Sequence, residues 1–369
     1  MMLSKADDYP IHQSPEPVAF AGQSRNFYDR YFFNGYDQEE DFFFALAMGI
    51  YPQLDVIDAG FSIIRNGVQH NILCSRPLGM ERMDTQVGPI TLKVIEPLQR
   101  LQIDIHVPEH GIEAQLIFHG RAPAQEEPRF TRRHGAQIFM DYTRMTQNGC
   151  WEGWVKHQGT HRVIEPQRIL GTRDRSWGIR PVGAADTQEN PAAPPLSQFY
   201  WLWAPINWAD GISLYHLNAD ADGVPWNTDG RYLATAAGQE GESMLSVASR
   251  LKFIPGTRHA AAAELFFRRR EGGEVHIQLK PRFHFYMKGI GYGHERFAHG
   301  TYQGGEANLY EEYVLAEVDD ALTLHIQAVC QATMTGDLGE KVGHGVLEQL
   351  IVGPHAPSGF RELLDMAPE

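Results

Sequence analysis

The chain has 369 residues, of which 43% are hydrophobic and 21% charged, and this ordinary globular composition excludes a disordered or fibrous protein. Its 32 basic and 46 acidic residues leave a formal net charge of −14, which disfavours nucleic acid as a partner because binding a polyanion requires a basic surface. The three cysteines are too few and too widely spaced for a disulfide framework or a zinc motif.

The start of the chain and its most apolar stretches bear on location. Residues 1–17 contain no apolar core of a secretory signal, and the apolar run 42–50 is far shorter than the roughly 20 residues of a membrane helix. We therefore expect a cytoplasmic protein that does not span a membrane.

Aromatic residues are concentrated in residues 31–44. They fit either the lining of a hydrophobic ligand cavity or ordinary core packing, the more usual role of aromatic side chains in strands. Asn34 and Tyr36 lie in this segment and are candidate ligand contacts. Farther on, Asp55 and Asp58 have an odd spacing, so in a regular strand they face opposite sides and at most one faces a given cavity.

Strict alternation of apolar and polar residues predicts antiparallel strands in both halves of the chain. The segments 101–107 and 112–118 predict a hairpin of half-buried strands, and 275–280 and 322–328 repeat the pattern. Amphipathic helices are scarce because 36 glycines and 22 prolines interrupt the chain. We expect an all-β fold of two antiparallel units with few short helices, and alternation alone leaves sandwich and barrel open.

The densest group of charges is the segment Gly171–Pro181, which contains three arginines, one aspartate and one tryptophan. If Asp174 is enclosed, it must be protonated or paired, and Arg173, Arg175 or Arg180 could hold it. The segment fits a structural clasp between domains and a catalytic group equally well.

A linker is predicted at Pro181–Ser197, where small and polar residues surround four prolines. Prolines cannot donate to a sheet ladder, so this stretch separates two structured units. We place the first domain at residues 20–185 and the second at residues 196–366.

The glycine-rich segment 288–300 lacks the order and context of a phosphate-binding loop. Its two histidines, His294 and His299, are candidates for proton transfer. The 17 histidines show neither H-x-H nor H-E-x-x-H, so no metal site is expected, and no G-x-S-x-G nucleophile elbow is present.

Four segments together resemble a known superfamily. Phe33–Asp37, Met48–Pro52, Gly171–Pro181 and Gly343–Glu348 are similar to segments of the hydroxyneurosporene synthase (carotenoid hydratase) and AttH-like proteins, and the likeness extends over most of the chain. The R-D-x-S-W-G core at residues 173–178 is the most specific of them. The resemblance implies two tandem lipocalin-like β-barrels with a ligand site in or between them, and so it favours barrel over sandwich.

The resemblance also implies a function, namely hydration, isomerisation or cyclisation of a terpenoid, steroid-like or prenylated molecule by acid catalysis without a cofactor. Under this hypothesis Asp174 is the proton donor, Asp58 is the reserve acid and His294 orients or deprotonates water. Trp177 and Tyr292 would stabilise a cation, whereas Arg173 and Arg180 would orient the substrate.

One physical objection concerns the proton donor. An aspartate paired with arginine has a lowered pKa, so an Asp174 held by arginine would be structural. The alternative function is a non-catalytic carrier of a hydrophobic small molecule, which needs only a cavity. The partner expected in either case is a hydrophobic small molecule, and a homodimer is possible.

Overall fold

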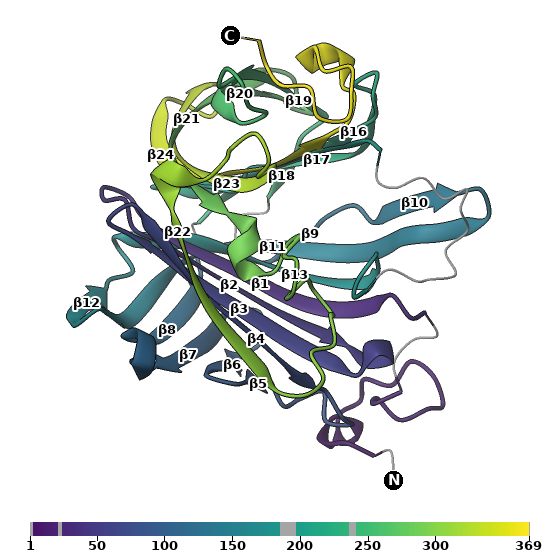
Figure 1. Cartoon of the computed structure of the whole chain (residues 1–369). Helices are drawn as coiled ribbons and strands as arrows, with labels where there is room; N and C mark the ends of the chain where they lie inside the picture. Colours follow the sequence, from purple (N-terminus) through teal and green to yellow (C-terminus); the bar gives the residue numbers. More distant parts are fainter. Residues whose placement is uncertain (1–2, 21–23, 185–196, 236–240, 369) are drawn as a thin grey trace.

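The computed structural model describes residues 3–20, 24–184, 197–235 and 241–368, and it consists of β-strands, short 3-10 helices and loops (Figure 1). This confirms the predicted all-β tandem fold. Within these ranges no helix has the length and apolar character needed to cross a membrane. The six 3-10 helices described are η1 (Lys5–Asp8), η2 (Pro52–Leu54), η3 (Pro108–His110), η4 (Met287–Ile290), η5 (Leu315–Glu317) and η6 (Ala356–Ser358).

The first sheet contains 14 of the described strands, and its neighbours pair antiparallel. It curls around a core of aliphatic and aromatic side chains (Figure 1). Its path is β22 (Ala307–Val314), β4 (Val68–Pro77), β3 (Val56–Arg65), β2 (Phe43–Tyr51), β1 (Phe27–Asp37), β13 (Ile169–Ile179), β11 (Gln137–His157), β8 (Ile112–Gly120), β7 (Arg100–Val107), β6 (Ile90–Glu96) and β5 (Gln86–Val87), while β9 (Gln125–Glu126), β10 (Phe130–His134) and β12 (Thr160–Ile164) pair with β11.

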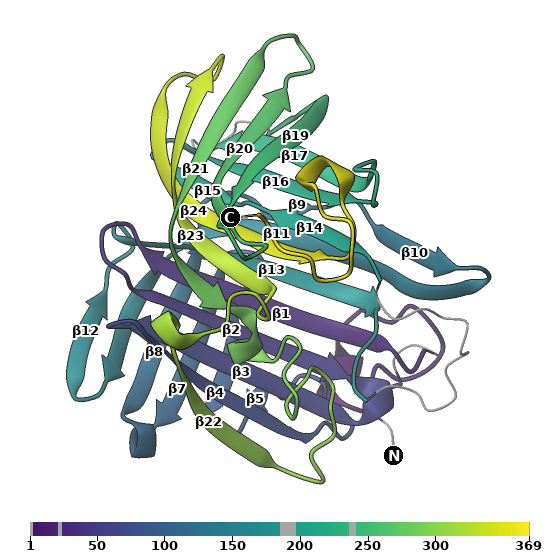
Figure 2. The same cartoon turned by 45° about the horizontal axis from the view of Figure 1, so that its top comes forward.

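The second sheet contains ten of the described strands and curls around a separate core (Figure 2). Its path is β18 (Glu242–Ser243), β17 (Pro225–Ala234), β16 (Gly211–Ala219), β14 (Phe199–Trp203), β24 (Lys341–Val352), β23 (His325–Gly336), β21 (Glu274–Tyr286), β20 (Ala260–Arg268) and β19 (Ser246–Phe253), while β15 (Ile206–Trp208) pairs with β16 and β24.

One strand of the second half of the chain belongs to the first sheet. Strand β22 pairs with β4, with Leu309 opposite Leu73, and it runs along the first sheet in both views (Figures 1 and 2). The curl of the sheet brings β22 close to the opposite edge, which β5 and β6 form. Asn308 of β22 lies so near to Gly88, between these two strands, that a Cβ on Gly88 would be 2.6 Å from Asn308 Oδ1. The two halves are therefore interleaved by one crossing strand.

The predicted strands agree with the structure, with one displaced boundary. Strands β7 and β8 form the expected hairpin with alternating burial. The strand expected at 322–328 begins only at His325, because the N–H groups of Leu322 and Thr323 bond back to the carbonyl of Asp319 in a turn. The linker predicted at 181–197 falls mostly on residues 185–196, which lie outside the described part.

A third core lies between the two sheets. It joins β1, β2 and β13 of the first sheet to β14, β21, β23 and β24 of the second, with Phe32 against Trp203 and Phe43 against Phe285. The curled first sheet encloses its own core, and we call this unit the first barrel. Because side chains alternate along a strand, its strands direct one set of side chains into the interior of the first barrel and the other set into the layer between the sheets. The polar residues described below lie within it.

Candidate functional site between the two sheets

The arginine-rich motif of β13 is divided by the alternation of the strand. Its odd-numbered members face the first barrel, where Arg173 donates to Gln147 Oε1 at 2.7 Å and the Arg175 guanidinium lies 4.0 Å from the centre of the Tyr31 ring. Its even-numbered members face the layer between the sheets. The motif therefore contributes residues to two places, the first barrel and the layer between the sheets, and Asp174 lies in the layer between the sheets.

Strand register places several charged residues in one row across the first sheet. The row runs from Asp58 on β3 through Gly49 and Arg30 to Ser176 and Arg144 on β11. All of them face the second sheet because they occupy the same phase of alternation. Asp174 lies two residues from Ser176 on the same face of β13, opposite Phe32 of β1 and Thr146 of β11.

Arg144 is fully engaged by a different carboxylate. Its Nε and Nη2 donate to Glu127 Oε2 at 2.8 and 2.5 Å, and its guanidinium lies 4.5 Å from the centre of the Trp201 ring. Burial opposes ionisation of Glu127, but the charges of Arg144 and His216 outweigh it, and the pKa of Glu127 is lowered. Arg144 and Glu127 thus form a buried ion pair beside Asp174.

A second buried carboxylate comes from the second sheet. Glu348 on β24 accepts hydrogen bonds from His325 Nε2 at 2.9 Å, Gln327 Nε2 at 2.8 Å and Trp201 Nε1 at 3.2 Å. These donors outweigh burial and lower the pKa of Glu348. Because Nε2 of His325 donates to the carboxylate, Nδ1 of the neutral ring carries a lone pair and can accept a proton.

Asp174 is the exception among the carboxyl groups of this layer. Among the described residues it has no hydrogen-bond or ion-pair partner, although Arg144 and Arg30 act on it through their charges. Burial outweighs these charges and raises the pKa of Asp174 to about 7, and the negative charges of Glu348 and Glu127 add to the effect. The residue keeps part of its surface accessible. A carboxyl group with this pKa is partly protonated at neutral pH and is chemically able to donate its proton.

Asp58 is the second carboxyl group with a raised pKa. Its Oδ2 accepts the N–H of Gly300 at 2.6 Å and its Oδ1 accepts the hydroxyl of Tyr51 at 3.3 Å. Burial nevertheless raises the pKa of Asp58 to about 6, against the lowering effect of the Gly300 N–H and the charge of Arg30. Unlike Asp174, Asp58 is held by two donors, which suits a positioning role.

Tyr292 links the two halves of the cluster. The guanidinium of Arg30 lies 4.3 Å from the centre of its ring, and the rings of His299 and His325 each meet it edge-on at 4.5 Å. Nε2 of His299 lies 2.9 Å from the carbonyl oxygen of Ile290 and must donate to it. Its Nδ1 therefore accepts from Arg30 Nη1 at 3.1 Å, and burial and the nearby arginines lower its pKa.

Arg30 has donor groups to spare. Its side chain is 1% exposed, and neither Nε nor Nη2 has a hydrogen-bond partner in the part of the chain that the structure describes. The hydroxyl of Tyr28 is likewise buried without a partner there. Arg180 lies over the Tyr28 ring at 4.3 Å. Buried donors without acceptors are costly, so this end of the cluster has the chemistry to receive an oxygen atom of a ligand.

Trp177 lies at the mouth of the first barrel rather than between the sheets. It is 41% exposed and borders a cavity of about 890 Å³ between the N-terminal segment 6–20 and the barrel strands. The charged and aromatic residues of its lining include Phe20, Phe27, Tyr31, Trp177, Arg82, Lys93, Arg175, Glu16 and Asp29. Its volume is in the range typical of small-molecule sites.

Two further predicted site residues make structural contacts. Tyr36 is fully buried, donates to the carbonyl of His344 and accepts from Asn207. Asn34 donates to Gln327 Oε1 at 2.9 Å, and so it positions the amide that holds Glu348.

His294 lies in the loop after η4. Its Nδ1 accepts the N–H groups of Arg296 and Phe297, and its Nε2 faces Glu311 at 3.2 Å. None of these contacts of His294 involves Asp174 or Tyr292, so the structure does not bring His294 together with the predicted acid. His325, in contrast, contacts the Tyr292 ring.

Sequence reasoning missed Arg30, Glu127, Arg144, His325 and Glu348. The sequence around Glu348 could have indicated a buried acid. An acidic residue that directly follows Val346 and Leu347 within a strand is either buried or at the edge of a sheet. His325 lay inside a predicted strand but was not identified as functional. Glu127 lies in an irregular segment, and nothing in its neighbourhood indicates burial.

Comparison with known proteins places the chain. Residues 3–361 match the model of a protein family described as "Family of unknown function (DUF8625)". The chain belongs to this family. No curated protein matches the sequence. Membership therefore identifies relatives but assigns no reaction.

The chain is similar to several solved structures. An AttH-like protein from Nitrosomonas europaea is 12% identical, with a TM-score of 0.53 over 93% of this chain and 98% of that chain. Kievitone hydratase from Nectria haematococca is 13% identical, with a TM-score of 0.48 over 88% of this chain and 89% of that chain. CghA is 9% identical, with a TM-score of 0.49 and 89% of each chain covered. The likeness to the AttH-like protein shows the fold alone, and function must be argued from the site.

Proposed function

We propose that the chain is an acid-catalysed hydratase, isomerase or cyclase that acts on a hydrophobic unsaturated molecule between its two sheets. The observation that carries this proposal is the contrast between Asp174 and Glu348. Among the described residues Asp174 has no hydrogen-bond or ion-pair partner, and burial raises its pKa to about 7, whereas Glu348 has three donors and a lowered pKa. Carboxyl groups whose pKa values are driven apart within one site provide an acid and a base.

In a hydration, Asp174 donates its proton to one carbon of a C=C bond, and water adds to the other carbon. The proton lost by the water passes to Nδ1 of His325, whose Nε2 is held by Glu348. The sum of these steps is the addition of one water molecule, after which a proton returns from His325 to Asp174 through solvent. If no water adds to the protonated substrate, loss of a different proton from it gives an isomer. Attack by another group of the same molecule on the protonated substrate gives a ring.

The charges of the cluster favour one class of substrate. The charges of Arg30 and Arg144 act on Asp174, and Arg180 lies near Tyr28 and Tyr292 of the same cluster, so a free hydrocarbon cation is poorly stabilised there. The donors of Arg30 and the Tyr28 hydroxyl that have no partner among the described residues suit a carbonyl or phenol oxygen. We therefore favour a terpenoid, steroid-like or prenylated substrate that contains an oxygen function conjugated with, or close to, the reacting double bond.

Incubation with a pooled library of terpenoids, steroids and prenylated phenols, followed by mass spectrometry of the bound and released molecules, tests this proposal. We expect a product heavier by water, or an isomer of unchanged mass, from the wild type and from the control D84N, whose aspartate lies on the surface. D174N should bind the same compound and release it unchanged. Turnover by D174N at the wild-type rate would refute the assignment.

A carrier function is the second candidate, and the cavity of about 890 Å³ at the mouth of the first barrel favours it. Its aromatic lining suits an apolar body, and the arginines Arg82 and Arg175, which share the single carboxylate of Asp29, leave one positive charge for an anionic group. Recovery of one unchanged ligand from the wild type, with affinity unaffected by D174N and weakened by W177A, would support this alternative.

A further inference from the structure

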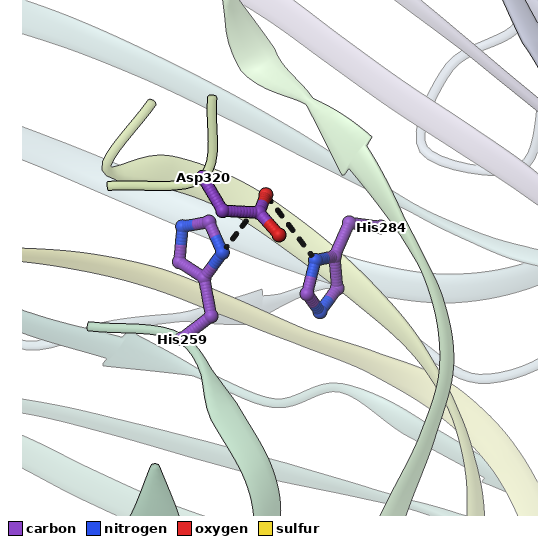
Figure 3. A group of neighbouring side chains, drawn as sticks. All are labelled: His259, His284 and Asp320. Atoms are coloured by element: carbon purple, nitrogen blue, oxygen red, sulfur yellow. Dashed lines mark ion pairs between the residues drawn. The ribbon is translucent and has the colours of Figure 1, made fainter. Parts of the chain in front are cut away.

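Three potential metal ligands gather beside the core of the second sheet (Figure 3). His259 directly precedes β20, His284 lies on β21, and Asp320 lies in the loop between η5 and β23. One ligand atom from each of them lies within 4.8 Å of those of the other two. Figure 3 shows both imidazole rings directed toward the Asp320 carboxylate. No short motif joins these residues, since they come from three separate segments.

The contacts of His259 leave a lone pair facing this carboxylate. Its Nε2 lies 2.8 Å from the carbonyl oxygen of Thr323, so Nε2 carries the hydrogen. In the neutral ring, Nδ1 is then an acceptor, and it lies 3.3 Å from Asp320 Oδ1, which is also an acceptor. His259 is fully buried, and Nδ1 has no hydrogen-bond partner among the described residues. Two acceptors at this distance repel each other unless a cation or an additional proton lies between them.

His284 and Tyr286 complete the surroundings of the carboxylate. Nδ1 of His284 lies 4.0 Å from the same Oδ1 atom, and the hydroxyl of Tyr286 donates to it at 2.8 Å. An outer hydrogen bond to a ligating carboxylate, and a carbonyl that accepts the second N–H of a ligating histidine, are the usual supports of metal sites. Here Tyr286 and Thr323 provide both.

We propose that His259, His284 and Asp320 bind one divalent transition-metal ion of the zinc type. Two imidazole nitrogens and one carboxylate oxygen are a donor set for zinc, cobalt or iron, and they are unsuited to calcium or magnesium, which prefer oxygen. Ligand atoms bonded to one zinc at about 2.0–2.2 Å lie roughly 3–3.5 Å apart. The separation of 3.3 Å between His259 and Asp320 meets this requirement, and His284 reaches it by a small side-chain movement.

The remaining coordination positions are accessible from the pocket beside the three ligands. His284 and Asp320 both line a pocket of about 520 Å³, together with Tyr286 and the neighbouring loop residue Leu315. A site with three protein ligands and an accessible pocket has room for water or a small anion as a further ligand.

The position of the site also suggests an effect on stability. The loop that contains Asp320 follows β22, which belongs to the first sheet, and precedes β23, which belongs to the second. A metal bound by Asp320, His259 and His284 would fasten this connection to β20 and β21. Binding should therefore raise the melting temperature of the whole chain, because the metal binds only the folded arrangement.

Calorimetric titration of the EDTA-treated, dialysed full-length protein with Zn²⁺, and with Co²⁺ as a spectroscopic probe, tests the assignment. We expect one equivalent bound per chain, a visible Co²⁺ absorption band from nitrogen and oxygen ligands, and a metal-dependent rise in melting temperature. H284A and D320N should each weaken binding by at least about 100-fold, and Y286F by roughly 10–100-fold. The control H276A removes a histidine of the same strand that lies 3.6 Å from Glu264, and it should bind as the wild type does.

Circular dichroism of each variant shows whether it folds, and D320N preserves the shape of the side chain if H284A does not fold. Equal Zn²⁺ affinity in the wild type, H284A and D320N would show that other histidines bind the ion and would overturn the proposal. Failure of the folded wild type to bind Zn²⁺ or Co²⁺ would overturn it as well. None of these measurements depends on turnover at Asp174.

Discussion

Asp174 and Arg175 are neighbours in the chain, yet their side chains lie on opposite faces of β13. Arg175 pairs with Asp29 and covers the Tyr31 ring at the mouth of the first barrel. Asp174 faces the second sheet, where Glu127 holds Arg144 and Arg30 donates one N–H to His299, and among the described residues neither arginine forms an ion pair or a hydrogen bond with Asp174. The objection that an arginine would hold Asp174 ionised therefore does not apply, and its pKa is raised to about 7 instead.

The first prediction concerns activity against pH. Because Asp174 must be protonated to donate, kcat/KM for a converted library compound should fall as pH rises through about 7, the pKa of this carboxyl group. D174N should lose at least about 100-fold in kcat, and D174E should keep part of the activity. Rates measured between pH 5 and 9 check this. A flat profile in which D174N equals the wild type would exclude Asp174 as the acid.

The second prediction concerns stability and needs no substrate. The folded pKa of Asp174 is above its ordinary value of 3.8, so the folded state binds the proton more tightly, and this group costs stability as pH rises from about 4 to 7. The cost at high pH is at most about 4 kcal/mol. D174N should therefore unfold at higher urea than the wild type at pH 8, with a smaller difference at pH 5. An equal difference at both pH values would contradict the raised pKa.

The third prediction compares a buried ion pair with an exposed one. Removal of Glu127 leaves Arg144 buried without its carboxylate, so E127A should lower the free energy of unfolding by about 3–5 kcal/mol. K93A breaks the Lys93–Asp104 pair, in which the lysine is 55% exposed, and should cost less than about 1 kcal/mol. Urea denaturation at pH 7 measures both values. Similar costs would show that Arg144 finds another partner or reaches water.

The fourth prediction concerns the cavity of the first barrel. The anionic aromatic probe 8-anilinonaphthalene-1-sulfonate should bind there, because Trp177 supplies an apolar face and Asp29 balances only one of the two arginines, Arg82 and Arg175, that it pairs with. W177A should weaken binding about tenfold, which corresponds to roughly 1.4 kcal/mol. The control W154A removes a tryptophan that stacks on His161 outside the cavity lining, and it should leave affinity unchanged. Fluorescence titration of the wild type, W177A and W154A with the probe measures the three affinities.

The sequence by itself determined the strands and their faces. Alternation at 101–107 and 112–118 predicted β7 and β8, because a half-buried strand needs apolar residues at every second position and no distant contact alters that local requirement. The same rule separates Asp174 from its neighbours Arg173 and Arg175, once β13 is known to be a regular strand with two buried faces.

Only the tertiary structure decided which charged groups meet. The partners of Glu348, Glu127 and Asp320 come from residues distant in the chain, and β22 joins a sheet that its sequence neighbours do not. A pKa depends on burial and on charges from every surrounding segment, so the raised pKa of Asp174 could not be predicted from its own motif. Local pattern fixes secondary structure and side-chain direction, whereas the chemistry of a carboxyl group depends on the groups that long-range packing brings to it.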